Sequence, residues 1–259
     1  MELHHVHLGE GQPLLLVHGL GSRWQTWDPI LQGLTAQREV IAVDLPGFGQ
    51  TPPLNGPVTI ATLAEAVAGF IDDHELSGVD LVGSSMGARL VLELARRGVG
   101  GTAVALDPGG FWSPAELQFF RITLGLSIRL VRLLQPVVPL LAANAVTRTV
   151  LLAQLSARPS AVDADLALQE LRSFAQSPSF DAVQHDLVYG APQQGAPAGS
   201  TPGRVVIGWG RKDRLTLPRQ AQRATELFPD ARLEWFDSGH FPHWDCPQAT
   251  VKVILAATG

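Results

Sequence analysis

The chain has 259 residues, of which 46% are apolar and 17% charged, and its formal net charge is −5. This is the balance of an ordinary soluble globular protein, which excludes extended disorder. The basic residues are scattered without a basic run, so we expect no nucleic-acid partner. The length allows one large α/β domain with an insertion.

The cysteine content and the apolar stretches indicate the compartment. Cys246 is the only cysteine, and no spacing of Cys and His suggests a metal site. The N-terminus lacks the basic and then apolar order of a secretory signal. Arginines and prolines interrupt the most apolar stretch, 122–155, so we expect no membrane span and see no clear amphipathic anchor for a lipid interface. These features predict a cytoplasmic protein without metal or cofactor.

Strands and helices alternate in the first 112 residues. Short apolar runs end in loops rich in Gly, Pro or Asp, and the stretches between them carry apolar residues at helical spacing. This alternation predicts a doubly wound, mostly parallel sheet whose functional groups gather at the carboxyl ends of the strands. The predicted strands are 14–17, 40–43, 79–82 and 103–106, and the predicted helices are 24–34, 60–71 and 88–97.

The second half of the chain begins with a different pattern. From residue 113 to 189 the strand signal disappears and Leu, Val, Arg and Ala recur at helical spacing. Strands resume at 205–209 and 233–236. We therefore predict a core of residues 1–112 and 191–259 that is interrupted by a helical insertion, 113–190.

One turn has the pattern of a nucleophile elbow. Gly83, Ser85 and Gly87 form G-x-S-x-G between a predicted strand and a predicted helix. A sharp turn of this kind exposes the serine oxygen, and the flanking glycines relieve crowding against the neighbouring elements. The helix N-terminus favours a developing negative charge, and the Met86 N–H can donate to it. Ser84 has no such flanks and is assigned a local structural part.

A nucleophilic serine needs a base, and neutral imidazole is the usual one near neutral pH. His240 follows the last predicted strand, so it should lie at the same edge of the sheet as Ser85. His243 is the alternative, but Phe241 and Pro242 suggest a packed turn in which it is a supporting polar group.

The imidazole in turn needs a carboxylate to hold its tautomer. Asp213 follows the strand 205–209 and gives the chain order Ser, Asp, His that is expected with this turn. Asp107, at the end of the strand 103–106, is the main rival, and we assign it a loop-shaping part. Asp237 is too close in sequence to reach around the histidine.

A second oxyanion donor can come from the loop after the first core strand. This loop begins with His18 and Gly19, and the backbone N–H of Leu20 can point at the oxyanion. His18 directly follows a buried strand, which favours a structural histidine that shapes the loop.

Together these residues resemble the α/β-hydrolase superfamily. Four motifs agree in order: His18-Gly19, Asp44-Leu45-Pro46-Gly47-Phe48-Gly49, the turn at Ser85, and Ser238-Gly239-His240-Phe241-Pro242. The resemblance covers the core and implies the α/β-hydrolase fold, Ser85 as nucleophile, Asp213 as acid and His240 as base. It also implies the Leu20 and Met86 amides as the oxyanion hole, and the insertion is similar to the helical cap of this superfamily. We expect an apolar substrate pocket lined by Trp24, Phe111, Trp112 and Phe241, together with Phe119, Phe120 and the Leu and Val residues of 122–155 from the insertion.

The sequence thus predicts a serine hydrolase that cleaves an ester-like bond of a small, apolar substrate, an ester or a lactone, through an acyl-enzyme on Ser85. A perhydrolase or haloperoxidase-like activity with the same triad stays open. So does carbon–carbon bond hydrolysis, although the superfamily members with that activity commonly carry Trp where this chain has Phe241. The hypothesis from another class is a low-turnover ligand-binding protein with this fold.

Overall fold

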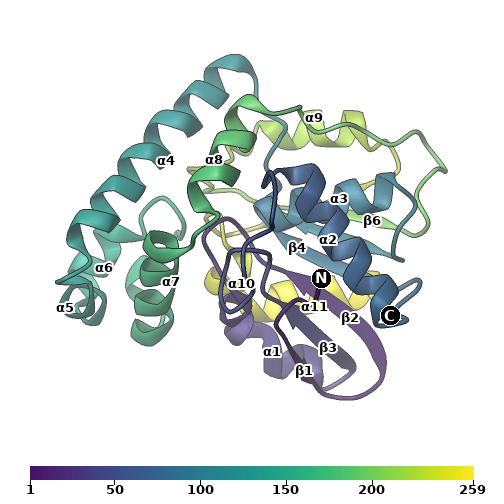
Figure 1. The fold of residues 1–259 in the computed structure, drawn as a ribbon, viewed down its shortest axis with the longest axis horizontal. Coiled ribbons are helices and arrows are strands. Elements are labelled where there is room, and N and C mark those ends of the chain that lie inside the picture. The colour runs from purple at the N-terminus through teal and green to yellow at the C-terminus, as the bar shows by residue number, and fades with distance from the viewer.

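The computed structural model describes all 259 residues and has a seven-stranded sheet at its centre (Figure 1). The strand order is β1-β3-β2-β4-β5-β6-β7, and β1 alone runs antiparallel to its neighbour. The predicted doubly wound, mostly parallel sheet is therefore confirmed. The strands are β1 His5–Leu8, β2 Gln12–Val17, β3 Arg38–Val43, β4 Asp80–Ser84, β5 Ala103–Leu106, β6 Val205–Gly210 and β7 Arg232–Phe236.

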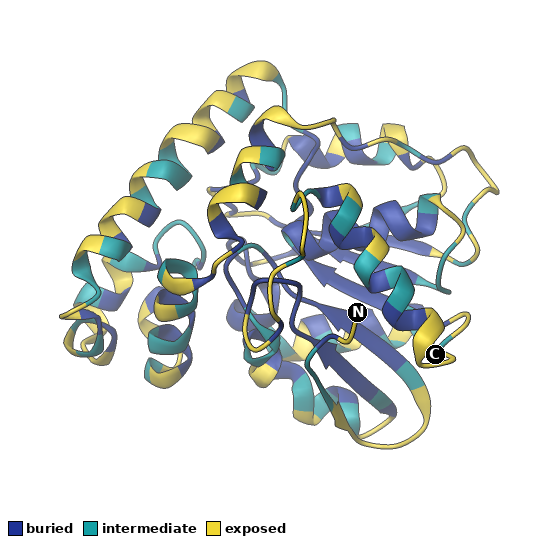
Figure 2. Cartoon of the chain, viewed as in Figure 1, coloured by how far each residue is buried: buried dark blue, intermediate teal, exposed yellow.

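Helices cover both faces of the sheet because successive strand residues point to opposite sides. Leu14 and Leu16 pack with α1 and α11 in one cluster, whereas Leu15 and Val17 pack with α2, α3 and α9 in the other. Burial is nearly complete along the central strands (Figure 2). These helices are α1 Asp28–Thr35, α2 Ile60–Asp73, α3 Met86–Arg96, α9 Gln220–Leu227 and α11 Pro247–Thr258, with the short α10 Pro242–Asp245 before the last.

Five helices lie between β5 and β6 and gather beside the carboxyl ends of the strands, at the left of Figure 1. We call them the helical insertion. It has its own apolar cluster, which Phe241 and Trp244 of the core complete. The Ser113 side chain and Glu116 form a capping box at the start of its longest helix. The five helices are α4 Pro114–Leu134, α5 Val138–Ala143, α6 Ala145–Leu151, α7 Ala164–Gln176 and α8 Phe180–Tyr189.

Two elements differ from those that we predicted. β1 was not predicted because its sequence has no apolar run. It is an edge strand that forms by pairing with residues 40–43 of β3. The single helix predicted over 24–34 is a 3₁₀ turn, Trp24–Trp27, followed by α1, whose first turn contains Pro29. Proline is favoured in the first turn of a helix because a backbone N–H at that position would have no acceptor within the helix. None of the helices combines the length and apolar character needed to cross a membrane.

Candidate active site

Ser85 lies in the tight turn between β4 and α3, with φ 56° and ψ −113°. This left-handed φ is rare for a residue with a side chain. A Cβ on Gly83 would lie 2.2 Å from the Gly87 oxygen, and a Cβ on Gly87 would lie 2.1 Å from the Val17 oxygen. Gly87 is therefore required for α3 to pass so close to β2, and Gly83 for the end of β4 to lie against the first turn of α3. The sharp turn leaves the Ser85 oxygen at the carboxyl edge of the sheet.

The structure brings Ser85, His240 and Asp213 together from three different strand ends. The Ser85 Oγ lies 2.8 Å from His240 Nε2, and His240 Nδ1 lies 2.8 Å from Asp213 Oδ2. The side chains of Asp213 and His240 have no exposed surface. Low exposure excludes competing water, so this relay of hydrogen bonds is strong and directional. With Nδ1–H donated to the carboxylate, Nε2 is free to accept a proton from Ser85.

The carboxylate of Asp213 is held by three further donors. Its Oδ1 accepts the backbone N–H groups of Leu215 at 2.7 Å and Thr216 at 3.1 Å, and its Oδ2 accepts the Thr216 hydroxyl at 2.6 Å. These donors satisfy a carboxylate that is buried and fix the orientation of the oxygen that faces the imidazole.

Asp107, the rival acid, lies beside this group but does not bond to the histidine. Its Oδ1 accepts the Gly210 N–H at 2.8 Å, whereas its Oδ2 is buried without a partner. Burial, and then the charge of Asp213, raise the pKa of Asp107 well above its usual range. One carboxylate oxygen each of Asp107 and Asp213 and one ring nitrogen of His240 lie within 4.8 Å of one another. These three residues are the one group in the chain whose spacing would suit a metal ion. Because His240 Nδ1 is already bonded to Asp213, Asp107 is a neighbour of the pair and not a member of it.

Two backbone N–H groups near Ser85 have no hydrogen-bond partners of their own. Met86 is the first residue of α3, so its N–H has no acceptor within the helix. Leu20 lies in the loop after β2 and lines the same pocket as Ser85, and its N–H donates to no other group. His18 shapes this loop: its Nδ1 donates to the Gly19 oxygen at 2.7 Å, and its Nε2 accepts the Leu45 N–H at 3.0 Å. Burial lowers the pKa of His18 and keeps it neutral.

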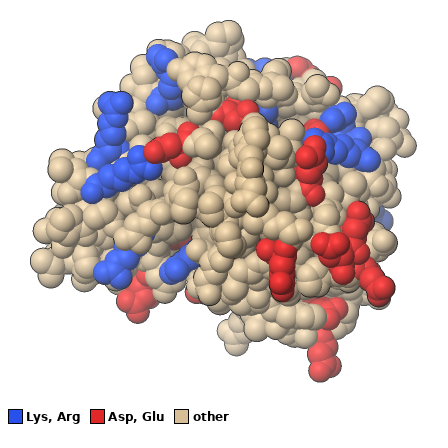
Figure 3. Space-filling model, in the orientation of Figure 1, with Lys and Arg blue, Asp and Glu red and all other residues tan.

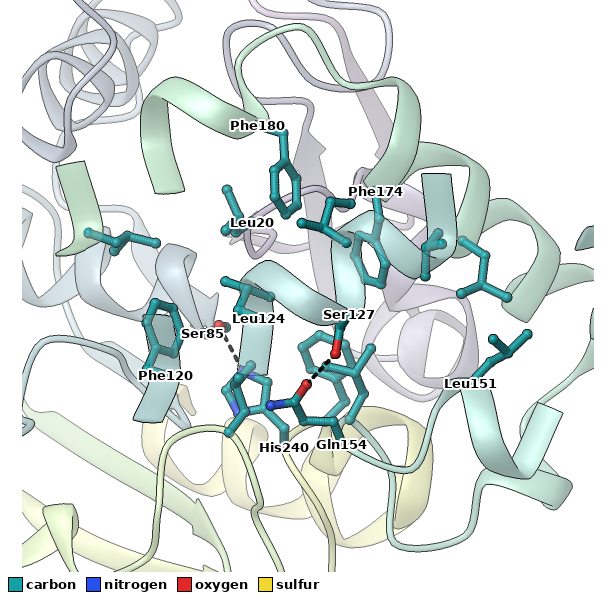
Figure 4. Close-up of a pocket in the computed structure, with 17 residues that line it drawn as sticks. Leu20, Ser85, Phe120, Leu124, Ser127, Leu151, Gln154, Phe174, Phe180 and His240 are labelled. Carbon is teal, nitrogen blue, oxygen red and sulfur yellow. Dashed lines mark hydrogen bonds between the residues drawn. The ribbon is translucent and has the colours of Figure 1, made fainter. Parts of the chain in front are cut away.

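The pocket above Ser85 lies between the sheet edge and the insertion (Figure 4). Thirteen of its 17 lining residues are hydrophobic, and the other four are Ser85, His240, Ser127 and Gln154. The Ser127 hydroxyl donates to the Gln154 side-chain oxygen at 3.0 Å. The apolar lining is Leu20, Phe120, Leu124, Ile128, Val131, Leu151, Leu155, Leu171, Phe174, Phe180, Leu187, Leu215 and Phe241.

Three of the four core residues predicted for the pocket do not line this cavity. Phe241 does, but Trp24 packs on the cluster beneath α1, and Phe111 is buried edge-on against Phe228 at 6.4 Å between ring centroids. Trp112 stacks on Phe120 at 4.8 Å and supports the pocket wall from behind. Of the insertion residues expected at the pocket, Phe120, Leu124 and Val131 line the cavity, whereas Phe119 is exposed on the other side of α4. The helical spacing of these apolar residues does not say which face of the helix points inward.

The insertion also contacts the loop that carries Leu20. The Ser22 hydroxyl donates to Glu170 Oε1 of α7 at 2.9 Å. Glu170 is fully buried, and burial raises its pKa to about 8, so at neutral pH the carboxyl is protonated. Nearby, His243 Nε2 lies 3.3 Å from the Thr26 hydroxyl, and burial lowers the pKa of His243 to about 3. His243 is thus a neutral structural group on the far side of the loop.

A serine at a strand–helix elbow, with histidine and aspartate supplied by later strand ends, is the arrangement that defines an α/β hydrolase. The model of the alpha/beta hydrolase family matches residues 14–253, and the chain belongs to this family. The curated relatives include the dihydrolipoyllysine-residue acetyltransferase component of the acetoin cleaving system of Cupriavidus necator, 29% identical over 242 residues. That match covers 90% of this chain but 59% of the relative, so the chain spans less than two thirds of it.

Two further matches extend the comparison. The 2-hydroxy-6-oxo-2,4-heptadienoate hydrolase of Pseudomonas putida is 40% identical over 94 residues, which is 35% of this chain and 34% of that protein. The structure of a thermophilic esterase from Thermogutta terrifontis superposes with a TM-score of 0.76 at 20% identity, covering 98% of this chain and 92% of the esterase. At this identity the structural likeness supports the fold alone.

Proposed function

We propose that the protein is a serine hydrolase that cleaves an ester-like bond of a neutral, apolar substrate through an acyl-enzyme on Ser85. The observation that carries this proposal is the continuous hydrogen-bonded path from Ser85 Oγ through His240 to Asp213, which opens into an apolar pocket. Membership in the α/β hydrolase family supports a hydrolytic reaction.

The geometry suits two successive acyl transfers. As the Ser85 oxygen attacks the substrate carbonyl, His240 Nε2 takes the hydroxyl proton and Asp213 stabilises the imidazolium. The Leu20 and Met86 N–H groups stabilise the oxyanion, which collapses when the alcohol leaves with the proton from His240. Water then attacks the acyl-enzyme, gives its proton to His240, and releases the acid while the proton returns to Ser85.

The lining of the pocket selects the substrate class. Apart from His240, no lining residue is ionisable, so a charged acyl group would be buried without a counter-ion. The heptadienoate hydrolase in the comparison is named for a carboxylate substrate. This pocket offers no Lys or Arg for such a group, which favours a neutral ester or lactone over carbon–carbon cleavage of an anionic dienoate.

The test compares Ser85→Ala with Ser84→Ala on p-nitrophenyl butyrate. Ser84 is the matched control because it is adjacent, fully buried and has an unpartnered hydroxyl. We expect Ser85→Ala to lose on the order of 10⁴- to 10⁶-fold in kcat, whereas Ser84→Ala stays within a few-fold of the unsubstituted protein. Equal loss in both variants, or no loss in Ser85→Ala, would refute the assignment of the nucleophile.

Two further measurements separate the alternatives. A fluorophosphonate should phosphonylate the Ser85 oxygen in the folded protein with loss of fluoride, which mass spectrometry detects as the added phosphonyl group, and a failure to react would favour a ligand-binding protein. A p-nitrophenyl ester whose acyl chain ends in carboxylate should react at least about tenfold more slowly in kcat/KM than the neutral ester of equal length. Faster turnover with hydrogen peroxide than with water as the acyl acceptor would indicate a perhydrolase.

A further inference from the structure

The outer face of α4 carries an apolar stripe that the rest of the chain leaves largely exposed. Phe119, Ile122, Leu126, Leu130 and Leu133 recur at intervals of three and four and are 41–77% exposed. The 3.6-residue repeat places them along one side of the helix, which we call the α4 stripe. A helix on the surface of a globular protein normally turns its apolar face to the core. In Figure 2 the outward turns of α4 are coloured as exposed.

The opposite face of α4 already has its own apolar contacts. Phe120, Leu124, Ile128 and Val131 point inward and line the pocket above Ser85. The α4 stripe is therefore surplus to what the fold needs. It continues onto neighbouring parts of the insertion, where Leu140 is 74% exposed. Nine of the fourteen exposed large hydrophobic residues of the whole chain lie between residues 119 and 150.

The charge of this region differs from that of the rest of the molecule. Residues 117–162 contain five arginines and no Asp or Glu, whereas the chain as a whole has a net charge of −5. Arg121, Arg129 and Arg132 lie along one flank of α4, where they line a shallow groove beside α8. On the face shown in Figure 3, most of the side chains over the insertion at the left are basic with a few acidic ones among them, and most of those over the core at the right are acidic apart from one basic cluster.

The three arginines differ in how far they are already paired. Arg132 forms a bidentate ion pair with Asp181, and Arg121 donates to the Tyr189 hydroxyl at 2.9 Å. Arg129 is exposed and pairs with no acidic side chain. At least two guanidinium groups thus remain unneutralised next to the α4 stripe. Exposed apolar side chains with a basic flank are the pattern of a helix that lies in a membrane interface.

We propose that the α4 stripe and its arginine flank dock on the surface of an anionic lipid bilayer. The apolar side chains would enter the boundary between headgroups and acyl chains, and Arg121 and Arg129 would bind lipid phosphates. Charge favours this occupant over a second copy of the chain, because residues 117–162 hold no carboxylate and the one in the groove, Asp181, already pairs with Arg132, so a facing copy offers little to pair with Arg121 and Arg129. Docking holds the pocket about one helix diameter, roughly 10 Å, from the lipid.

The experiment is flotation of the full chain with vesicles at 150 mM salt. One set is phosphatidylcholine alone, and the other contains 30% phosphatidylglycerol. We expect at least about tenfold stronger partitioning to the anionic vesicles, falling steeply at 1 M salt because exposed charges are then screened. Equal binding to both sets, or binding to neither, would overturn the proposal.

Variants test the two parts of the surface separately. The double variant Leu130→Ser with Leu133→Ser should lose binding by at least about tenfold, whereas Leu227→Ser, on an exposed position of the core, should not. Arg129→Gln should weaken binding about fivefold, and Arg204→Gln, an exposed control on the core, should leave it unchanged.

Oligomeric state and activity complete the test. Sedimentation should give a monomer, and a dimer that Leu130→Ser with Leu133→Ser dissociates would refute the proposal by showing that a second copy covers the stripe. Hydrolysis of a soluble ester should be unchanged in these variants, since none of the substituted residues lines the pocket. Failure of the ester assay in the unsubstituted protein would count against the proposed function and leave the vesicle result interpretable on its own.

Discussion

Glu170→Gln removes the one carboxyl of the insertion that is buried against the loop carrying Leu20. Burial raises the pKa of Glu170 from 4.5 to about 8 in the folded protein. In the unfolded chain the same carboxyl is solvated and ionises near its ordinary value. Between these two pH values the folded state therefore holds one proton more than the unfolded state.

This difference sets the pH dependence of stability. Where the folded state binds the extra proton, the free energy of unfolding falls by about 1.4 kcal/mol per pH unit. Over about 3.5 units the contribution amounts to about 5 kcal/mol, on the order of a third or more of the stability of a typical domain. It is fully present below pH 4.5 and is lost as the pH rises through about 8.

Urea unfolding followed by tryptophan fluorescence between pH 5 and pH 8 measures this effect. Because glutamine does not titrate, the free energy of unfolding of Glu170→Gln relative to the unsubstituted protein should rise by about 4 kcal/mol across this range. Glu65→Gln, on the exposed side of α2, is the control and should give a constant difference. Parallel profiles for Glu170→Gln and the unsubstituted protein would refute a protonated, buried Glu170.

Gly87→Ala should lower the free energy of unfolding by about 3 kcal/mol in the same urea assay, since its Cβ would lie 2.1 Å from the Val17 oxygen. Gly69→Ala, which meets nothing within 4 Å inside α2, should instead be neutral or stabilising by up to about 1 kcal/mol, and a similar result for both would contradict the close approach. Asp213→Asn should reduce kcat on p-nitrophenyl butyrate about 10⁴-fold with little change in KM, because the amide favours the wrong tautomer of His240; a loss below about tenfold would remove Asp213 from this role.

The positions of Ser85, Asp213 and His240 could be predicted because their signals are local. Each follows a short apolar strand, and parallel strands bring their carboxyl ends to one edge of the sheet. The turn at Ser85 also needs glycines at fixed offsets, which the sequence displays directly. Asp107 also follows a short apolar strand, so the sequence pattern alone could not choose between it and Asp213. The hydrogen bonds do: Asp213 pairs with His240, whereas Asp107 accepts the Gly210 N–H.

The pocket could be predicted only in part: its Leu and Phe residues from the insertion were expected, but the residues that follow β5 were misplaced. Phe111 and Trp112 directly follow a strand end, yet one turns into the core and the other stacks behind Phe120. Side-chain direction at these positions depends on how α4 packs, which is a tertiary property. α4 is apolar on two faces, so its periodicity identifies a helix but does not identify the face toward Ser85. The interleaved arginines similarly look scattered in sequence and align only on the folded helix.

The left-handed backbone conformation of Ser85 lowers the stability of the fold while it exposes the serine side chain. A residue with a side chain at φ 56° costs on the order of 1–3 kcal/mol relative to a relaxed conformation, and glycine would not incur that cost. Under the proposed function, Ser85→Gly would therefore stabilise the fold and abolish the reaction with one substitution. Under that function, selection for stability alone would favour glycine at position 85, and the requirement for turnover would retain the serine.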